Sequence, residues 1–270
     1  RSVYFVSGLW VIFWRLAGSE EGLYAIGSIL THKALWSSCV VWGTGTLCHD
    51  SLSGETLRVF PLNRSIPKLI KRLISPETTK ADIRAVRGPL TREAILKEGG
   101  KCPEIYGDPA IIMPRLYTPK IGAKHKAGLI LHHTQETPTT HVLAKTCGFH
   151  QISIDRVRDE QLENFIDEVC SCQKIFSSSL HGIILAQAYG IPAQWIQITN
   201  TPIHRDANHK FADYFLGAGL PVQKPISIEL TKESLSQLMQ ISPERVHISS
   251  DLIERLLEVF PFDIFPKKWS

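Results

Sequence analysis

Several sequence patterns that define a cofactor or metal site are missing from this chain of 270 residues. It has no GxxxxGK[ST] phosphate loop, and Gly43-Thr44-Gly45 matches only the beginning of a dinucleotide fingerprint, without the acidic residue that follows about 20 positions later. HExxH and repeated CxxC spacings are absent, as is the GxSxG pattern of serine hydrolases. We therefore expect no cofactor and no metal ion.

The chain also has few cysteines and a small net charge. The six cysteines show no metal-ligand spacing, which favours free thiols in a reducing cytoplasm. The formal net charge is +4 without a long basic run, so the sequence does not indicate binding to nucleic acid. Hydrophobic residues make up 43% and charged residues 21% of the chain, which is typical of a globular protein.

The longest apolar run, Tyr4–Trp14, is shorter than the ~20 residues that span a bilayer. We favour a core helix or strand for it. Attachment to a membrane surface and a signal peptide remain open alternatives.

Short apolar runs that end at glycines or polar residues recur along the chain and predict buried parallel strands. Helical spacing separates some of them, as in the segment that begins at Pro89 and ends at Gly99-Gly100. The runs read as strands are Leu23–Ile26, Cys39–Trp42, Leu57–Phe60, Ile83–Val86, Ala127–Leu131, Gln151–Ile154, Ile175–Phe176 and Ala193–Ile198.

This alternation predicts an α/β fold of two Rossmann-like domains with a cleft between them. Residues 114–126 are rich in proline and lysine and form the best candidate linker. We accordingly divide the chain into domains 1–118 and 119–270.

The segment Ile175–Ala193 has the most specific pattern. A strand leads into Ser177-Ser178-Ser179, then into a helix that begins near His181, and a glycine ends that helix. Free N–H groups at a helix start attract anions, while serine hydroxyls and a histidine add hydrogen-bond donors and a proton carrier. This pattern indicates an enzyme that handles a small phosphorylated molecule.

Other polar residues follow predicted strands and belong at the same edge of the fold: Thr44, Arg87, Asp108, His132 and His133. Taken singly, each has a simpler explanation. Arg87 could pair with a carboxylate, Asp108-Pro109 could be a turn, and the adjacent histidines lack the partners of a zinc site.

The order of several short motifs resembles the polysaccharide pyruvyl transferase family, most closely its bacterial exopolysaccharide branch. The resemblance covers about residues 22–220. It rests on Gly43-Thr44-Gly45, Ile83–Thr91, Gly107–Ala110, Gly128–His132, Ser179–Gly182 with the Ile-Pro that follows, and Lys210–Tyr214.

The resemblance implies a fold like that of GT-B glycosyltransferases. It also implies transfer of pyruvate from phosphoenolpyruvate, as a co-substrate, to two hydroxyls of a hexose as a cyclic ketal. The implied acceptor is a polysaccharide or a lipid-linked oligosaccharide, which suggests a cytoplasmic protein that associates peripherally with the inner face of the cytoplasmic membrane.

Two features depart from the family pattern. Ser179 stands where many members carry arginine, which shifts donor binding to Arg87, Arg84 or Lys210. The Asn-x-Gly-Asp segment expected near the start is absent, and residues 1–20 are largely apolar there.

We expect His181 to act as the acid or as a phosphate ligand, with Asp108 or His132 as its helper. Arg87 and the helix start from Ser178 to Gly182 are expected to bind the donor, with Thr44 and His133 nearby. A glycosyltransferase that uses a nucleotide sugar and a non-catalytic glycan-binding relative remain the alternatives.

Overall fold

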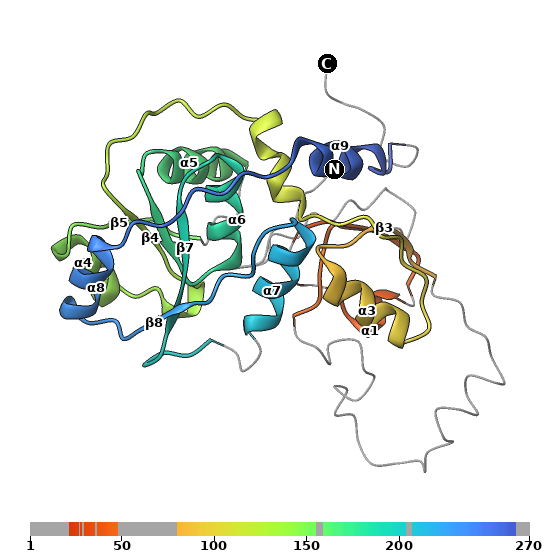
Figure 1. Cartoon of the computed structure of the whole chain (residues 1–270), viewed down its shortest axis with the longest axis horizontal. Helices are drawn as coiled ribbons and strands as arrows, with labels where there is room; N and C mark the ends of the chain where they lie inside the picture. Colours follow the sequence, from red (N-terminus) through yellow and green to blue (C-terminus); the bar gives the residue numbers. More distant parts are fainter. Residues whose placement is uncertain are drawn as a thin grey trace, which may run out of the picture.

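The computed structural model describes residues 22–26, 28, 30–35, 37–47, 80–154, 159–203 and 207–262. Within them the chain forms two parallel β-sheets flanked by helices, as Figure 1 shows. The α/β class with parallel sheets predicted from the sequence is thus confirmed, and it is consistent with a Rossmann-like fold.

The first sheet contains β1 (Gly22–Tyr24), β2 (Cys39–Trp42) and β3 (Asp82–Ala85) in that spatial order. An isolated parallel bridge between Val86 and Tyr106 extends it by one position. Helices α1 (His32–Leu35) and α3 (Pro89–Lys97) accompany this sheet, and the buried Leu35 and Ile95 lie in one cluster with Val41 of β2.

The second sheet has five strands in the order β5-β4-β6-β7-β8. Its strands are β4 (Gly128–Ile130), β5 (His150–Gln151), β6 (Ile175–Ser177), β7 (Ala193–Ile198) and β8 (Ile226–Ile228). All neighbouring pairs are parallel.

Helices cover both faces of the second sheet. Because side chains alternate along each strand, neighbouring residues contact different helical layers. Leu129 of β4 shares a cluster with residues of α4 (Pro138–Thr146) and α8 (Lys232–Gln240). Ile130, the next residue, joins the cluster that contains α5 (Asp159–Cys170) and α6 (Leu180–Ala188). The central strands β4 and β6 are buried along their whole length, which explains their largely apolar composition.

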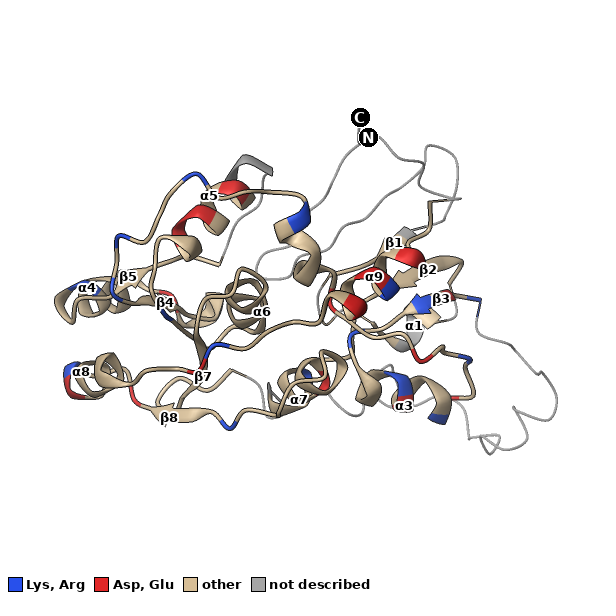
Figure 2. Ribbon diagram, turned by 45° about the horizontal axis from the view of Figure 1, so that its top comes forward, with Lys and Arg blue, Asp and Glu red and all other residues tan. Residues whose placement is uncertain are grey.

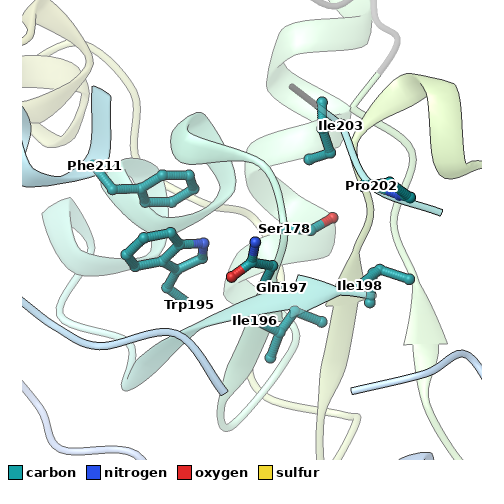
Figure 3. A pocket seen from close by; sticks show the side chains of 8 residues that line it. All are labelled: Ser178, Trp195, Ile196, Gln197, Ile198, Pro202, Ile203 and Phe211. Carbon is teal, nitrogen blue, oxygen red and sulfur yellow. The ribbon is translucent and has the colours of Figure 1, made fainter. Parts of the chain in front are cut away.

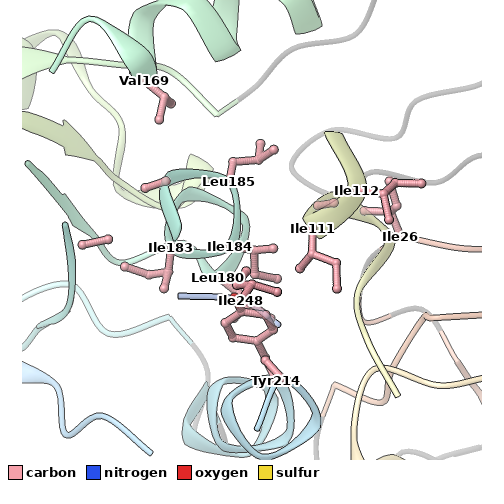
Figure 4. Packing of buried hydrophobic residues seen from close by; sticks show 14 of the residues in the cluster. Ile26, Ile111, Ile112, Val169, Leu180, Ile183, Ile184, Leu185, Tyr214 and Ile248 are labelled. Carbon is pink, nitrogen blue, oxygen red and sulfur yellow. The ribbon is translucent and has the colours of Figure 1, made fainter. Parts of the chain in front are cut away.

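The largest apolar cluster joins the two halves of the described chain. It contains Trp42 of the first sheet, Ile111 of the 3₁₀ helix η2 (Pro109–Arg115), and Ile184 of α6. Figure 4 shows Ile111 directed toward Ile184 of α6, while Ile112 lies beside Ile26 on the other side of η2. The two halves therefore share a continuous hydrophobic core at this position.

Helix α9 (Ser250–Glu258) returns from the second half to the first. The indole N–H of Trp42 donates to the Leu256 carbonyl at 2.8 Å, across a sequence separation of 214 residues. The Leu256 side chain also lies against Gly107, where a Cβ would approach its Cδ2 to 3.0 Å. Helix α7 (Ala207–Gly217) makes a second connection, because it packs on α3.

The observed strands follow the predicted ones with shifts at their ends. Cys39–Trp42 and Ala193–Ile198 agree with β2 and β7, whereas the strand expected at Gln151–Ile154 lies at His150–Gln151. The expected linker overlaps the end of η2, and the domain division at residue 118 stays a prediction. The apolar run Tyr4–Trp14 and the strand expected at Leu57–Phe60 lie outside the described residues.

Charged residues of both signs are distributed over the outer helices, whereas α6 carries none (Figure 2). In the part of the chain that the structure describes, no helix combines the length and the apolar character that crossing a membrane requires.

Gly217 is a specific test of the contact between α7 and α3. A Cβ at this position would lie 2.1 Å from the Arg87 carbonyl oxygen and 2.8 Å from Gly88 Cα. Because backbone cannot move aside cheaply, we expect Gly217→Ala to lower the free energy of unfolding by roughly 1–3 kcal/mol, as overpacking does. Urea denaturation measures the change. Gly122→Ala is the matched control, since nothing lies within 4 Å of a Cβ there; equal stability of the two variants would contradict the contact.

Candidate functional site

The strand order of the second sheet defines where a ligand site is expected. Chain order reverses between β4 and β6, which are spatial neighbours although β5 lies between them in sequence. In open parallel sheets, ligands bind at the carboxyl ends of the strands on either side of such a switch point. The residues there are His132-His133 after β4 and Ser178–His181 after β6.

Hydrogen bonds hold these two strand ends together. The Ser178 N–H donates to the Ile130 carbonyl at 3.0 Å, and the His132 N–H donates to Ser178 Oγ at 2.9 Å. Ser177 Oγ donates to the Ile130 carbonyl and accepts from the Ser179 N–H, both at 3.0 Å. The serine run predicted to bind a ligand therefore uses two of its three hydroxyls within the fold.

Ser179 is the exception. It occupies the N-cap of α6, yet its side chain makes no capping hydrogen bond. The first N–H groups of a helix have no partner within it and carry the positive end of the helix dipole. The amino end of α6, with the Ser179 hydroxyl beside it, is thus suited to bind an anion.

Gly182 brings α6 close to the sheet. A Cβ at this position would lie 2.4 Å from Ser177 Oγ and 3.0 Å from Ile130 Cγ2. The glycine in Ser-Leu-His-Gly is therefore required by packing, and its α-carbon faces the sheet. This places the beginning of α6 directly over the ends of β4 and β6.

His181 and Asp108 come from opposite halves of the chain and meet at this point. His181 Nε2 lies 3.5 Å from Asp108 Oδ2, and the side chains are 8% and 0% exposed. Neither atom has a hydrogen-bond partner among the described residues. An ionisable pair that is buried, close and otherwise unpartnered is typical of a functional site.

Asp108 is held firmly by its surroundings. Its Oδ1 accepts from the Ala110 N–H at 3.0 Å and caps η2, which leaves Oδ2 directed at the histidine. The preceding Gly107 has φ 137°, a conformation that favours glycine. Gly43, with φ 84°, allows Pro109 to pack against the end of β2.

Lys210 provides a buried cation on α7, next to Phe211. The residue is 7% exposed, and its ammonium lies 5.6 Å from the centre of the Phe211 ring. Burial, followed by the positive charge of Arg87, lowers the pKa of Lys210 to about 8. Among the described residues no carboxylate forms an ion pair with it, so its charge is available to a ligand.

Arg87 is buried and bonded on all sides within the protein. Its side chain is 0% exposed, with Nε donating to Asp213 Oδ2 at 3.0 Å. The other two nitrogens donate to Ser28 Oγ at 2.5 Å and to the Thr46 carbonyl at 2.8 Å. The structure thus shows Arg87 in a buried ion pair with Asp213, and its expected contact with an anionic donor stays a prediction.

Asp213 also caps α3 from a distance. Its Oδ1 accepts from the Thr91 N–H at 3.0 Å and its Oδ2 from Thr91 Oγ1 at 2.7 Å. Thr91 lies in the first turn of α3, whose N-cap Gly88 has no side chain to do this. Asp213 lies within the motif Lys210–Tyr214, whose pattern predicts no separate role for it. The lack of a capping side chain at Gly88 was the signal that α3 needs an acceptor from elsewhere.

The remaining predicted residues divide into two groups. Thr44 is buried at the end of β2, and its carbonyl accepts from the Arg87 N–H at 3.0 Å; the His133 ring lies tilted against the His132 ring, with ring centres 4.2 Å apart. Both lie at strand ends, as expected. Arg84 does not join them, because it lies within β3 and pairs with Asp82 at 2.8 Å on a partly exposed surface.

A small cavity lies beside Ser178, with a volume of about 20 Å³, room for about one water molecule. Figure 3 shows Trp195, Gln197 and Phe211 around it, and the Trp195 and Phe211 rings stack with centres 4.1 Å apart. Through Phe211, the first turns of α7 thus lie next to the end of β6.

Within the described residues, no three His, Cys, Asp or Glu side chains are arranged to hold a metal ion. The five described cysteines are unpaired. Burial raises the pKa of Cys102 to about 12 and that of Cys172 to about 11, so these thiols are poor nucleophiles.

Comparison with known proteins gives two findings. A family model described as polysaccharide pyruvyl transferase matches residues 38–200, more than half of the chain. This range includes Asp108 and His181 and ends before Lys210. The chain is also similar to the uncharacterized protein L143 of Acanthamoeba polyphaga mimivirus, with 29% identity over 116 residues. That alignment covers 42% of this chain and 40% of the viral protein.

Arg87 and Asp213 form a pair whose disruption has a defined expected cost. Removing one partner leaves an uncompensated charge in the interior, so we expect Arg87→Met to lower the free energy of unfolding by about 3–5 kcal/mol. Arg115→Met is the control, because Arg115 pairs with Glu254 where both side chains are 54% exposed. There we expect a change of about 0–1 kcal/mol. Chemical denaturation of the two variants measures the difference. An Arg87→Met protein as stable as the control would contradict the buried ion pair between Arg87 and Asp213.

Proposed function

We propose that this chain, which belongs to the polysaccharide pyruvyl transferase family, transfers pyruvate from phosphoenolpyruvate to a hexose as a cyclic ketal. The observation that carries the proposal is the meeting of Asp108 and His181 at the amino end of α6. Two titratable groups and an uncapped helix start are brought together at the switch point of a parallel sheet. This combination suits a reaction that binds an anion and moves protons.

In the proposed complex, the donor's phosphate lies against the first N–H groups of α6 and the Ser179 hydroxyl. Helix amides and a hydroxyl supply several hydrogen bonds to the oxygens of such a group. Lys210 supplies the positive charge. It takes the role expected of Arg87 because the guanidinium of Arg87 is sealed by Asp213.

The chemistry requires one proton delivered to carbon and two removed from hydroxyls. Protonation at C3 of phosphoenolpyruvate turns the methylene into a methyl group and leaves an oxocarbenium-like centre at C2. One sugar hydroxyl attacks C2, the bond between C2 and the phosphate oxygen breaks, and a second hydroxyl closes the ketal. Inorganic phosphate leaves. Of the two hydroxyl protons, one replaces the proton that was delivered to C3, and the other protonates the phosphate or solvent.

We assign the proton delivery to His181. Asp108 faces Nε2 and stabilises the protonated imidazole, as a carboxylate beside a histidine does. His132 is close in sequence to the β4 end but bonds Thr134 through Nδ1 at 2.8 Å, so we assign it to holding the loop.

The acceptor we propose is a hexose of a polysaccharide or of its lipid-linked precursor, met at the cytoplasmic face of a membrane. A glycosyltransferase reaction is the rival function, because similar folds carry it. It would release a nucleoside diphosphate, whereas pyruvyl transfer releases inorganic phosphate.

His181→Gln is the direct test of the proposed acid. We expect loss of at least 10²-fold in turnover, the lower end of what a positioned acid contributes, with little change in the thermal unfolding midpoint. The assay combines phosphoenolpyruvate with a panel of hexosides and follows phosphate release and product mass.

Asp108→Asn should share the direction of this effect, and His141→Gln is the control because His141 is exposed on α4. Turnover of His181→Gln at the level of the control would remove His181 from the mechanism. Release of a nucleoside diphosphate from nucleotide sugars, without phosphate release from phosphoenolpyruvate, would favour the rival function.

Lys210 gives the proposed donor site a pH dependence. Its pKa of about 8 means that the cation is present below that pH and is lost above it. The cationic form binds the anionic donor, so we expect the affinity for phosphoenolpyruvate to be constant below pH 8 and to fall by up to about tenfold per pH unit above it.

Titration calorimetry from pH 7 to 9.5 measures this profile. Lys210→Arg keeps its charge and should abolish the decline, while Lys210→Met should weaken binding at pH 7. Lys124→Met is the control on an exposed lysine. A decline that persists unchanged in Lys210→Arg would assign it to another group.

A further inference from the structure

We propose that Gln135 is a positioning residue of this site, which acts through Ser178 to fix the loops after β4 and β6. The inference rests on the proposed function, since it concerns the same site. Neither the sequence pattern nor the family resemblance gave Gln135 a role. It lies at the end of the 3₁₀ helix η3 (His133–Gln135) and is 3% exposed.

Both ends of its amide are used. Gln135 Oε1 accepts from Ser178 Oγ at 2.6 Å, and Nε2 donates to the Thr201 carbonyl at 2.6 Å. Thr201 follows β7, Ser178 follows β6, and Gln135 follows β4. One buried side chain thus connects the carboxyl ends of three adjacent strands.

The connection to Ser178 closes a ring. Ser178 Oγ, which donates to Gln135, accepts from the His132 N–H at 2.9 Å. The Gln135 N–H in turn donates to the His132 carbonyl at 2.7 Å. His132, Ser178 and Gln135 are thus hydrogen-bonded to one another in a closed ring. The ring fixes the distance between the loop after β4 and Ser178, the residue before the N-cap of α6.

The ring also selects which serine faces a ligand. A hydroxyl has one proton to donate, and that of Ser178 is directed to Gln135. Ser178 is therefore unavailable as a donor to phosphate, whereas Ser179 makes no capping bond. Gln135 keeps the first serine inside the fold and leaves the second at the amino end of α6.

The test compares Gln135→Met with Gln223→Met. Gln223 also uses both ends of its amide, accepting from the Trp195 N–H at 3.3 Å and donating to the Ala193 carbonyl at 3.2 Å, both in the amino-terminal half of β7. The Gln223 variant therefore reproduces the loss of a doubly bonded amide away from the carboxyl ends of the strands. We expect Gln135→Met to lower kcat/KM for phosphoenolpyruvate at least tenfold and Gln223→Met to change it less than twofold.

A double-mutant cycle separates positioning from a general loss of stability. If Gln135 acts through Ser178, the double variant Gln135→Met/Ser178→Ala should resemble Ser178→Ala within about twofold, because the two residues form one unit. Independent, multiplying effects would overturn the proposal. So would equal losses of kcat/KM in Gln135→Met and Gln223→Met.

A structural measurement keeps the inference separate from the proposed function. Amide hydrogen exchange of the peptide that contains His132 should accelerate in Gln135→Met and stay unchanged in Gln223→Met, because the acceptor of the His132 N–H is no longer held. If the unsubstituted protein releases no phosphate with any hexoside, the proposed function fails while this exchange still decides the role of Gln135. Unchanged exchange in Gln135→Met would overturn it.

Discussion

The buried ion pair between Arg87 and Asp213 is the contact on which the relation of the two halves depends. It joins the end of β3 to α7, and Asp213 also caps α3. Three glycines, Gly45, Gly88 and Gly217, let backbone approach this pair, since a Cβ at each would lie within 2.4 Å of a neighbouring atom. Two buried charges are tolerated only when they are fully paired and hydrogen-bonded. Substitutions of the residues around this pair are therefore expected to destabilise the fold. Lys210 lies one turn before Asp213 on α7, and its position follows from this anchor.

The two buried cationic residues, Arg87 and Lys210, have different roles in this arrangement. The guanidinium, which is charged at any physiological pH, stabilises the fold. The proposed ligand site relies on weaker and adjustable groups: helix amides, a hydroxyl, an imidazole beside a carboxylate, and an amine with a lowered pKa. Among them the amine of Lys210, whose pKa burial lowers to about 8, changes charge near neutral pH, which a permanent cation cannot do.

Sequence reasoning predicted the parts of this structure that depend on local pattern. The buried strands, the loop before α6 and the family follow from short apolar runs and from residues that are adjacent in the chain, and the family match agrees. The bacterial branch and the residue roles stay predictions. The partner of Arg87 could not be predicted, because Asp213 lies 126 positions away and many carboxylates compete for such a contact. Gln135 was missed because an amide that bridges backbone and hydroxyl groups has no sequence signature. Helices α4 and α7 were not anticipated, since their polar faces obscure the apolar spacing.

The path of α9 has a consequence for biosynthesis. Leu256 supports Gly107, and its carbonyl pairs with Trp42 across 214 positions. A nascent chain that has emerged only through the second sheet would lack the contact of Leu256 with Gly107, the residue before Asp108. The contacts of α9 with β2 and with the turn before Asp108 can therefore form only after the last described helix has been synthesised.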